Sequence, residues 1–155
     1  MRRVTLSEQE SRMGPADVEA PLTDVLGLTH SAINYYELDP CESPAYGYHA
    51  HESQEEVFYV VEGELTFRTA EGDVAVSAGE LVRFGPGEYQ RGVNEGDDRV
   101  RVLAVGAPQE AGETDVRRHC ASCEAETPQT LELADDRSAV VAYCEICGAE
   151  TGRFT

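Results

Sequence analysis

Short apolar runs recur between Ile33 and Gly106 of this chain, and turn residues separate them. No segment of this region repeats its apolar residues at the spacing of a helix. Short runs bounded by glycine, proline and acidic residues are typical of an antiparallel sandwich or barrel. The predicted strands are Ile33–Leu38, Tyr46–His51, Glu56–Val61, Glu64–Thr69, Asp73–Val76, Leu81–Phe84 and Val100–Val105.

The segments on either side of this region divide the chain into four parts. Residues 1–30 are polar and mixed, and we expect an N-terminal arm with one short helix or strand. Residues 31–106 form the predicted barrel, and residues 107–116, with Pro108 and several acids, read as an acidic linker. The remaining residues, 117–155, hold two strand-like runs, Thr130–Leu133 and Ala139–Tyr143.

The net charge of the chain limits the kinds of partner that it is expected to bind. It carries 30 acidic and 12 basic residues, a formal net charge of −18, and every basic residue is arginine. Such a charge repels phosphate backbones, so we do not expect nucleic acid as a partner. This composition, with acidic residues spread along the whole chain and no lysine, resembles that of cytoplasmic proteins of extreme halophiles. The alternative is an ordinary acidic protein of a mesophile.

No targeting or membrane segment is evident. A transmembrane helix needs about 20 apolar residues, and no run approaches that length. Arg2 and Arg3 are followed by polar residues rather than by an apolar stretch, so no signal peptide is expected. We therefore expect a cytoplasmic protein without membrane association.

Two cysteine pairs near the C-terminus predict a metal site. Each pair has the spacing C-x2-C, which lets two thiolates converge on one ion, and two such pairs complete a tetrahedral shell of the kind that Zn²⁺ prefers. Gly148, directly after the second pair, permits a tight turn. The segment resembles the zinc ribbon family, with the ligands Cys120, Cys123, Cys144 and Cys147.

A ribbon serves either as a platform for a partner or as a clip that stabilises a piece too small for its own core. Arg117-Arg118 is the only basic cluster of this segment, so a protein partner ranks above nucleic acid. His119 adjoins the first pair but is interpreted as a surface residue. Cys41 is interpreted as a spare thiol in a turn, because a reducing cytoplasm needs no disulfide.

A second constellation lies within the predicted barrel. His49 and His51 are two residues apart, so both side chains point to one face of a strand. A short loop then leads to Glu56 on the next strand. Two histidines and one carboxylate with open positions are the arrangement typical of non-haem iron sites. The alternative is that both histidines are polar residues of a hydrated, inactive cavity.

The surrounding residues strengthen the metal interpretation. The run Gly47-Tyr48-His49-Ala50-His51, followed by Glu56 and Gly63, resembles the first motif of the cupin family. The segment from Gly79 through Gly85-Pro86-Gly87 and Gln90 to Asn94 resembles the second. The resemblance implies an all-β fold, a double-sheet jelly-roll barrel with an internal pocket for a small molecule. It also implies a homodimer, and a metal held by His49, His51 and Glu56.

This chain departs from the family pattern at three positions. Ser43 stands in place of the leading glycine of the first motif, and the proline of the second is displaced to Pro86. Gln90 stands where the family has its last metal-binding histidine. An amide oxygen suits harder ions, so the barrel is expected to hold Mn²⁺ or Fe²⁺. The alternative is that the site has lost its metal and Gln90 binds a ligand instead.

Strand alternation assigns the neighbouring side chains. Phe58 and Val60 share the inward parity of Glu56 and are expected to form an apolar wall of the pocket. Glu55 is expected to point outward. Val57, Tyr59 and Val61 face the same outer side and form a candidate packing or dimer surface.

These features leave three functions open. The first is a metalloenzyme with isomerase, lyase, hydrolytic or dioxygenase chemistry on a small oxygen-bearing substrate. The second is a module that binds or senses a small ligand without turnover. The third is an interaction protein with a vestigial pocket. Fold alone cannot choose among them, because this barrel hosts many chemistries.

Overall fold

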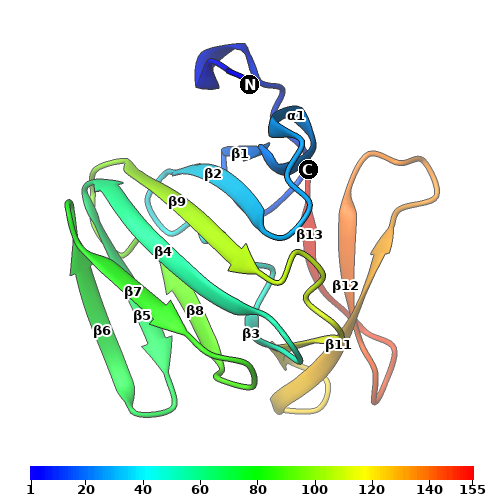
Figure 1. The fold of residues 1–155 in the computed structure, drawn as a ribbon. Coiled ribbons are helices and arrows are strands. Elements are labelled where there is room, and N and C mark those ends of the chain that lie inside the picture. Colours follow the sequence, from blue (N-terminus) through cyan, green and yellow to red (C-terminus); the bar gives the residue numbers. More distant parts are fainter.

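The computed structural model describes residues 1–155, and two antiparallel sheets make up most of it (Figure 1). A 3-10 turn at Leu6–Glu8 and a four-residue helix α1 (Thr23–Leu26) are the only helical elements. The five-stranded sheet has the order β1 (Val18–Pro21), β2 (Ala32–Leu38), β9 (Val100–Ala107), β4 (Glu55–Glu62) and β7 (Leu81–Phe84). The eight-stranded sheet has the order β13 (Glu150–Phe154), β12 (Val140–Cys144), β11 (Ala125–Leu133), β10 (Thr114–Cys120), β3 (Tyr48–His51), β8 (Gln90–Val93), β5 (Glu64–Thr69) and β6 (Gly72–Ser77). The all-β jelly-roll prediction is confirmed.

The main core lies between the two sheets and is built around three aromatic rings. Phe67 packs against Phe58 and Phe84 at centroid distances of 4.9 and 5.2 Å. Burying one such side chain stabilises the fold by about 1.5–3 kcal/mol. Because the three rings come from β4, β5 and β7, they join the two sheets to each other.

All seven strands predicted within the barrel are present, and β5 and β7 have the predicted bounds. The prediction missed β8, which reads Gln-Arg-Gly-Val and has a single large apolar residue. Gly92 packs directly against the core: a Cβ at this position would lie 3.0 Å from the side chain of Leu65, so there is little room for a larger apolar residue. A strand can therefore pack closely against the core without an apolar signal of its own.

The boundaries at both ends of the barrel differ from the expected ones. In the predicted arm, β1 pairs with β2 and so joins the five-stranded sheet. In the predicted linker, β10 begins at Thr114 and pairs with β3 from Thr114–His51 to Arg117–Tyr48. This segment forms a strand rather than a linker because Val116 turns inward and is buried, while the charged residues on either side of it face outward.

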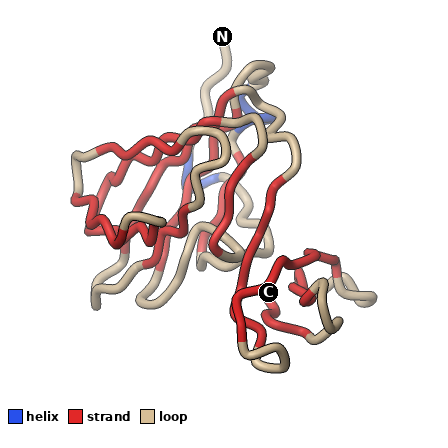
Figure 2. Tube along the Cα trace, turned by 90° about the horizontal axis from the view of Figure 1, so that it is seen from below, coloured by secondary structure: helices blue, strands red, loops and turns tan.

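The C-terminal strands β11–β13 are set apart from the barrel in Figure 2, yet β10 connects them to its sheet. Gly47 makes this connection sterically feasible, because a Cβ there would lie 2.5 Å from the carbonyl oxygen of Arg117. The structural role of Gly47 is therefore the close approach of the segment before β3 to β10.

The outer face of β4 follows the predicted alternation. Glu55 points outward and pairs with Arg83 at 2.6 Å, whereas Phe58 is buried. Tyr59 and Val61 are exposed, and Tyr59 lies opposite the exposed Leu81 of β7. None of the helical segments has the length and apolar character of a membrane-spanning helix.

Candidate metal site in the barrel

The three predicted barrel ligands converge. His49 and His51 point from β3 toward Glu56 on β4, and their ligand atoms all lie within 4.8 Å of one another. The Nε2 atoms of His49 and His51 are 3.9 and 3.6 Å from Oε2 of Glu56. His49 is buried, while His51 and Glu56 are partly exposed. Two imidazoles and a carboxylate at this separation can share one ion.

The far side of each imidazole is held by a specific partner. Nδ1 of His49 lies 3.2 Å from the carbonyl oxygen of Gly47, which can only accept a hydrogen bond. The proton therefore sits on Nδ1, and Nε2 keeps its lone pair toward Glu56. Burial lowers the pKa of His49 and favours this neutral form. Nδ1 of His51 lies 3.0 Å from Oγ1 of Thr114. Such partners fix ring orientation in metal sites.

Gln90 lies against the same cluster, as the sequence predicted, but its amide nitrogen faces it. Nε2 is 3.2 Å from both Nε2 of His49 and Oε2 of Glu56, so the amide can donate to both. Oε1 is buried without a hydrogen-bond partner. A half-turn of the amide would exchange the two atoms and present an oxygen to an ion. Gln90 can thus either bridge the two side chains or join them as a ligand.

A cavity of about 410 Å³ opens beside these residues, a volume that suits a small molecule. Phe58 lines it, as predicted. Val60 does not, because it lies two residues further along β4 and is fully buried in the main core. The cavity is lined by Arg12, Glu19, Asn34, Tyr36, Pro44, Ala45, Tyr46, His49, His51, Gln54, Glu56, Phe58, Thr114, Val116, Gln129 and Leu131.

The N-terminal segment contributes an ion pair that sequence reasoning missed. Nε of Arg12 donates to Oε1 of Glu19 at 2.6 Å, and both residues line the cavity. Glu19 is 2% exposed, and its Oε2 has no hydrogen-bond partner. Burial raises the pKa of Glu19, and Arg12 opposes that rise. No motif marks either residue, and only the odd placement of a glutamate in the apolar run Val18–Pro21 could have pointed to it.

Tyr36 lines the same cavity. Burial raises its pKa far above the ordinary value, and the nearby carboxylates of Glu19 and Glu56 raise it further. Its phenol therefore stays protonated and can donate a hydrogen bond to a bound molecule.

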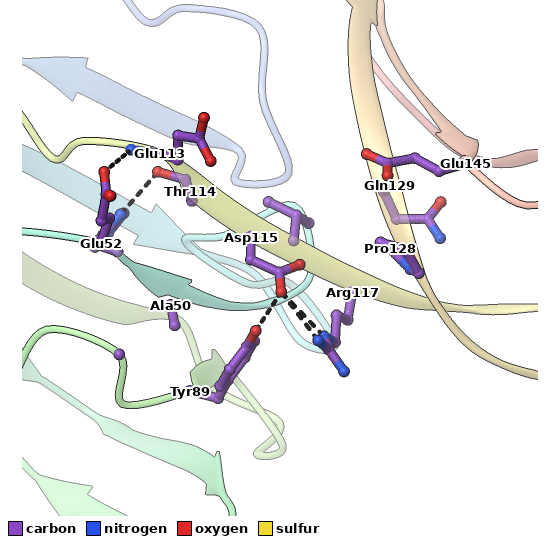
Figure 3. Close-up of a pocket in the computed structure, with 13 residues that line it drawn as sticks. Ala50, Glu52, Tyr89, Glu113, Thr114, Asp115, Arg117, Pro128, Gln129 and Glu145 are labelled. Carbon is purple, nitrogen blue, oxygen red and sulfur yellow. Dashed lines mark hydrogen bonds and ion pairs between the residues drawn. The ribbon is translucent and has the colours of Figure 1, made fainter.

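A second cavity, of about 600 Å³, lies between the barrel and the C-terminal strands (Figure 3). Its wall is polar: Asp115 accepts hydrogen bonds from Tyr89 and from Arg117, and Glu52 accepts one from the backbone of Glu113. His51 and Thr114 line both cavities. The contact between these two residues therefore belongs to the wall that separates the cavities.

The four cysteines of the predicted ribbon also converge. Sγ of Cys120 is 3.6 Å from that of Cys147, and Sγ of Cys123 is 3.9 Å from that of Cys144. Four sulfurs around one Zn²⁺ at about 2.3 Å would be about 3.8 Å apart, so the cluster fits a tetrahedral ion. A hydrogen bond from Thr127 lowers the pKa of Cys144 to about 6, while hydrogen bonding with Cys147 raises the pKa of Cys123 to about 12, so Cys144 is the first of the two to become a thiolate. Gly148 has φ +73°, the left-handed conformation expected of that glycine.

Comparison with known proteins supports the same fold. The cupin domain family matches residues 34–106. A sugar phosphate isomerase of the cupin superfamily from Silicibacter pomeroyi has a similar structure, with 22% identity, a TM-score of 0.61, and coverage of 99% of this chain and 91% of its own. The polyketide cyclase RemF from Streptomyces resistomycificus has 23% identity and a TM-score of 0.65, and the match covers 80% of this chain and 90% of that one.

A conserved protein with a double-stranded β-helix domain from Klebsiella pneumoniae has 20% identity and a TM-score of 0.61, over 75% of this chain and 96% of that one. No curated protein matches the sequence. At these identities the solved structures establish the fold, and the match over residues 34–106 establishes the family of that segment. Residues 34–106 are therefore a cupin domain, and a cluster of four cysteines follows it in the C-terminal region.

Proposed function

We propose that the barrel holds a divalent metal ion at His49, His51 and Glu56 and binds a small oxygen-bearing substrate beside it. The observation that carries this proposal is the hydrogen bond from Nδ1 of His49 to Gly47, because it keeps the proton off Nε2, the nitrogen that faces Glu56. The two other donor atoms lie within 4.8 Å, at the wall of a cavity large enough for a metabolite. Mn²⁺ and Fe²⁺ suit this mixture of nitrogen and oxygen donors.

A divalent ion bound there would act as a Lewis acid toward a substrate oxygen. The side chains of the cavity would do the rest of the binding. Arg12 can contact an anionic or carbonyl oxygen, since its side chain is half exposed, and Tyr36 can donate a hydrogen bond. Phe58 supplies an apolar surface and helps to exclude water. The substrate that fits is small, rich in oxygen and partly apolar.

Isomerisation is the reaction class that we favour. The structural relative from Silicibacter pomeroyi is named a sugar phosphate isomerase, and it aligns with 99% of this chain. An isomerisation next to a carbonyl needs a group that stabilises negative charge on oxygen and a partner that moves a proton. Glu19 is a suitable carboxyl group for the second role, because burial raises its pKa toward neutrality.

Gln90 favours a second function, a ligand-binding module without a barrel metal. Its amide nitrogen donates toward the same atoms, Nε2 of His49 and Oε2 of Glu56, that a metal ion would use. In that state Gln90 bridges His49 and Glu56 through its amide nitrogen, and its Oε1 is left without a partner. The cavity would then bind its ligand without turnover.

The four cysteines are proposed to hold a structural Zn²⁺, since all four sulfur atoms lie within 4.8 Å. A closed shell of four thiolates leaves no open position for substrate. The ion would therefore stabilise β11–β13 rather than take part in chemistry.

Elemental analysis tests both metal proposals at once. Protein purified anaerobically, without a metal-affinity tag, is expected to contain about one zinc and one manganese or iron ion per chain. His49→Ala should lose the second metal and keep the zinc. The control His30→Ala, an exposed histidine outside the cluster, should keep both. Zinc alone in the wild-type protein would contradict the metalloenzyme proposal and favour the binding module.

A further inference from the structure

Arginines gather on the outer face of the barrel in a chain that is otherwise strongly acidic. A cavity of about 410 Å³ is lined by seven residues, and four of these are arginines, a third of the 12 in the sequence. Glu126 is the only carboxylate among the seven. The four arginines are Arg68, Arg91, Arg117 and Arg118.

Strand register aligns several of these side chains in one row. Arg68 of β5 lies opposite Arg91 of β8, and Arg117 of β10 lies opposite Tyr48 of β3. His49 pairs with Gln90 across β3 and β8, so their neighbours Tyr48 and Arg91 are also opposite each other. The row therefore crosses four adjacent strands.

This row lies on the other face of the sheet from the barrel cavity. His49 and Gln90 point inward, so residues one position away point outward. None of the residues lining the arginine cavity lines the barrel cavity. The two sites are separated by the thickness of one sheet.

Two of the arginines share a single nearby carboxylate, that of Glu126. Arg91 and Arg118 form no ion pair, and Nε of each is buried without a hydrogen-bond partner. Arg118 is fixed by donating to the carbonyl oxygens of Tyr46 and Thr151. Arg91 is partly buried and faces Arg68 directly; like charges in such a cross-strand pair are destabilising. Burial and the charges of Arg118 and Arg68 lower the pKa of Arg91, and the charge of Glu126 opposes this without reversing it.

The other two arginines are paired only at the surface. Arg68 contacts Glu95 at 2.9 Å, and Arg117 contacts Asp115 at 3.1 Å (Figure 3). Exposed pairs of this kind contribute little to stability and can rearrange. Since acids outnumber bases by 30 to 12, carboxylate partners for Arg91 and Arg118 would be easy to supply. Instead, two guanidinium groups without an ion pair share the one carboxylate of Glu126, and this excess of positive charge favours an external anion.

We propose that this cavity binds the phosphate group of a small phosphorylated metabolite. A phosphate offers several acceptor oxygens, and planar guanidinium groups bind such oxygens in pairs. The volume exceeds that of the phosphate itself, which leaves room for an organic part beside Tyr48. A small ligand is favoured over nucleic acid because the net charge of −18 repels an extended polyanion while a local cluster still attracts one group.

Calorimetric titration at about 0.1 M salt tests this site, since exposed charges are strongly screened well above that concentration. The probes are inorganic phosphate and glycerol 3-phosphate. Saturable binding of at least one probe is expected, and Arg91→Gln should weaken it at least about tenfold. Tighter binding of glycerol 3-phosphate would assign an organic phosphate; equal binding would assign free phosphate. Both outcomes support an anion site.

Three control measurements show whether binding depends on this cavity in particular. Arg83→Gln, at an exposed arginine paired with Glu55 on the other sheet, should bind both probes like the wild type. His49→Ala should also bind both probes with the affinity of the wild type, because the two sites lie on opposite faces of the sheet. The phosphate proposal can therefore be tested independently of the barrel-metal proposal. Arg91→Gln is expected to melt no lower than the wild type, because it removes an unpaired, partly buried charge.

Absence of binding by either probe, or wild-type affinity in Arg91→Gln, would overturn the proposal. Binding of a single-stranded oligonucleotide more tightly than either probe would overturn the assignment to a small molecule.

Discussion

Oγ1 of Thr114 lies 3.0 Å from Nδ1 of His51, which joins the strand leading to the four cysteines directly to a candidate ligand of the barrel metal. We expect Thr114→Val to remove this hydrogen bond with little change in volume. Loss of a partner behind a metal-binding histidine typically lowers affinity by about 10–100-fold. Titration of metal-depleted protein with Mn²⁺ would measure the change. Thr130→Val, in the C-terminal strands, should leave the affinity unchanged.

Gln90→His is expected to raise the affinity of the barrel for divalent metal by at least about tenfold, because an imidazole nitrogen is a better donor than an amide. The same titration with Mn²⁺ or Fe²⁺ would show it. Unchanged affinity would mean that position 90 does not take part in metal binding, and would favour the role of Gln90 as a hydrogen-bonding bridge. Gln54→His, at a buried glutamine that lines the cavity outside the cluster, is the matched control.

Removal of zinc should unfold the C-terminal strands and spare the barrel core. Structural zinc contributes about 10–16 kcal/mol of apparent binding free energy, more than so small a segment gains from its own core. In Cys123→Ser, hydrogen exchange is expected to accelerate in β11–β13 while β5 stays protected. Cys41→Ser, at an exposed cysteine outside the cluster, should exchange like the wild type. Full protection of β11–β13 without metal would contradict the structural role.

Glu19→Gln should change how stability depends on pH. Burial raises the pKa of Glu19 above its value in the unfolded chain, so the native state binds the proton more tightly. The stability that this group contributes is present below about pH 4.5, the ordinary value, and is lost as the pH rises through the native pKa. The variant should therefore gain stability relative to the wild type as the pH rises across that range.

Urea unfolding at several pH values would measure this difference. A constant difference between Glu19→Gln and the wild type at all pH values would contradict the prediction.

The outer face of β4 and β7 remains the candidate dimer surface. Tyr59 and Leu81 lie opposite each other and are 40% and 65% exposed. If the protein is a homodimer through this face, Leu81→Asp should yield monomers, because the new carboxylate would be buried without a partner. Light scattering after size-exclusion chromatography would show the change. Val74→Asp, at an exposed valine of β6, should stay dimeric; a monomeric wild type would refute the dimer.

The sequence predicts well those strands and site residues that a local sequence pattern determines. Alternating apolar residues place β5 and β7, and the resemblance of the segment that holds His49, His51 and Glu56 to the first cupin motif identifies the cluster. The spacing of that motif favours Glu56 over Glu55, and strand alternation then turns Glu55 outward, where its carboxylate pairs with Arg83.

The parts that it misses depend on contacts between distant segments. Thr114 reaches His51 only because β10 pairs with β3, and nothing near Thr114 signals that pairing. Arg12 and Glu19 enter the barrel cavity because β1 joins the sheet beside β2. Val60 points to the same side of β4 as the cavity residues Glu56 and Phe58, but it lies further along the strand and is buried in the core. Alternation predicts which side a residue faces and not how far along the barrel it lies.

The pairing of β10 with β3 has a consequence for how the two parts of the chain can be separated. Without residues 114–120, β3 would end the barrel sheet with a row of unpaired backbone N–H and C=O groups, since β8 covers only its other side. Open strands of this kind invite pairing between molecules and aggregation. The strand that leads to the cysteines thus covers this edge of the barrel sheet, and a chain cut at the end of the matched segment, residue 106, is expected to aggregate through β3.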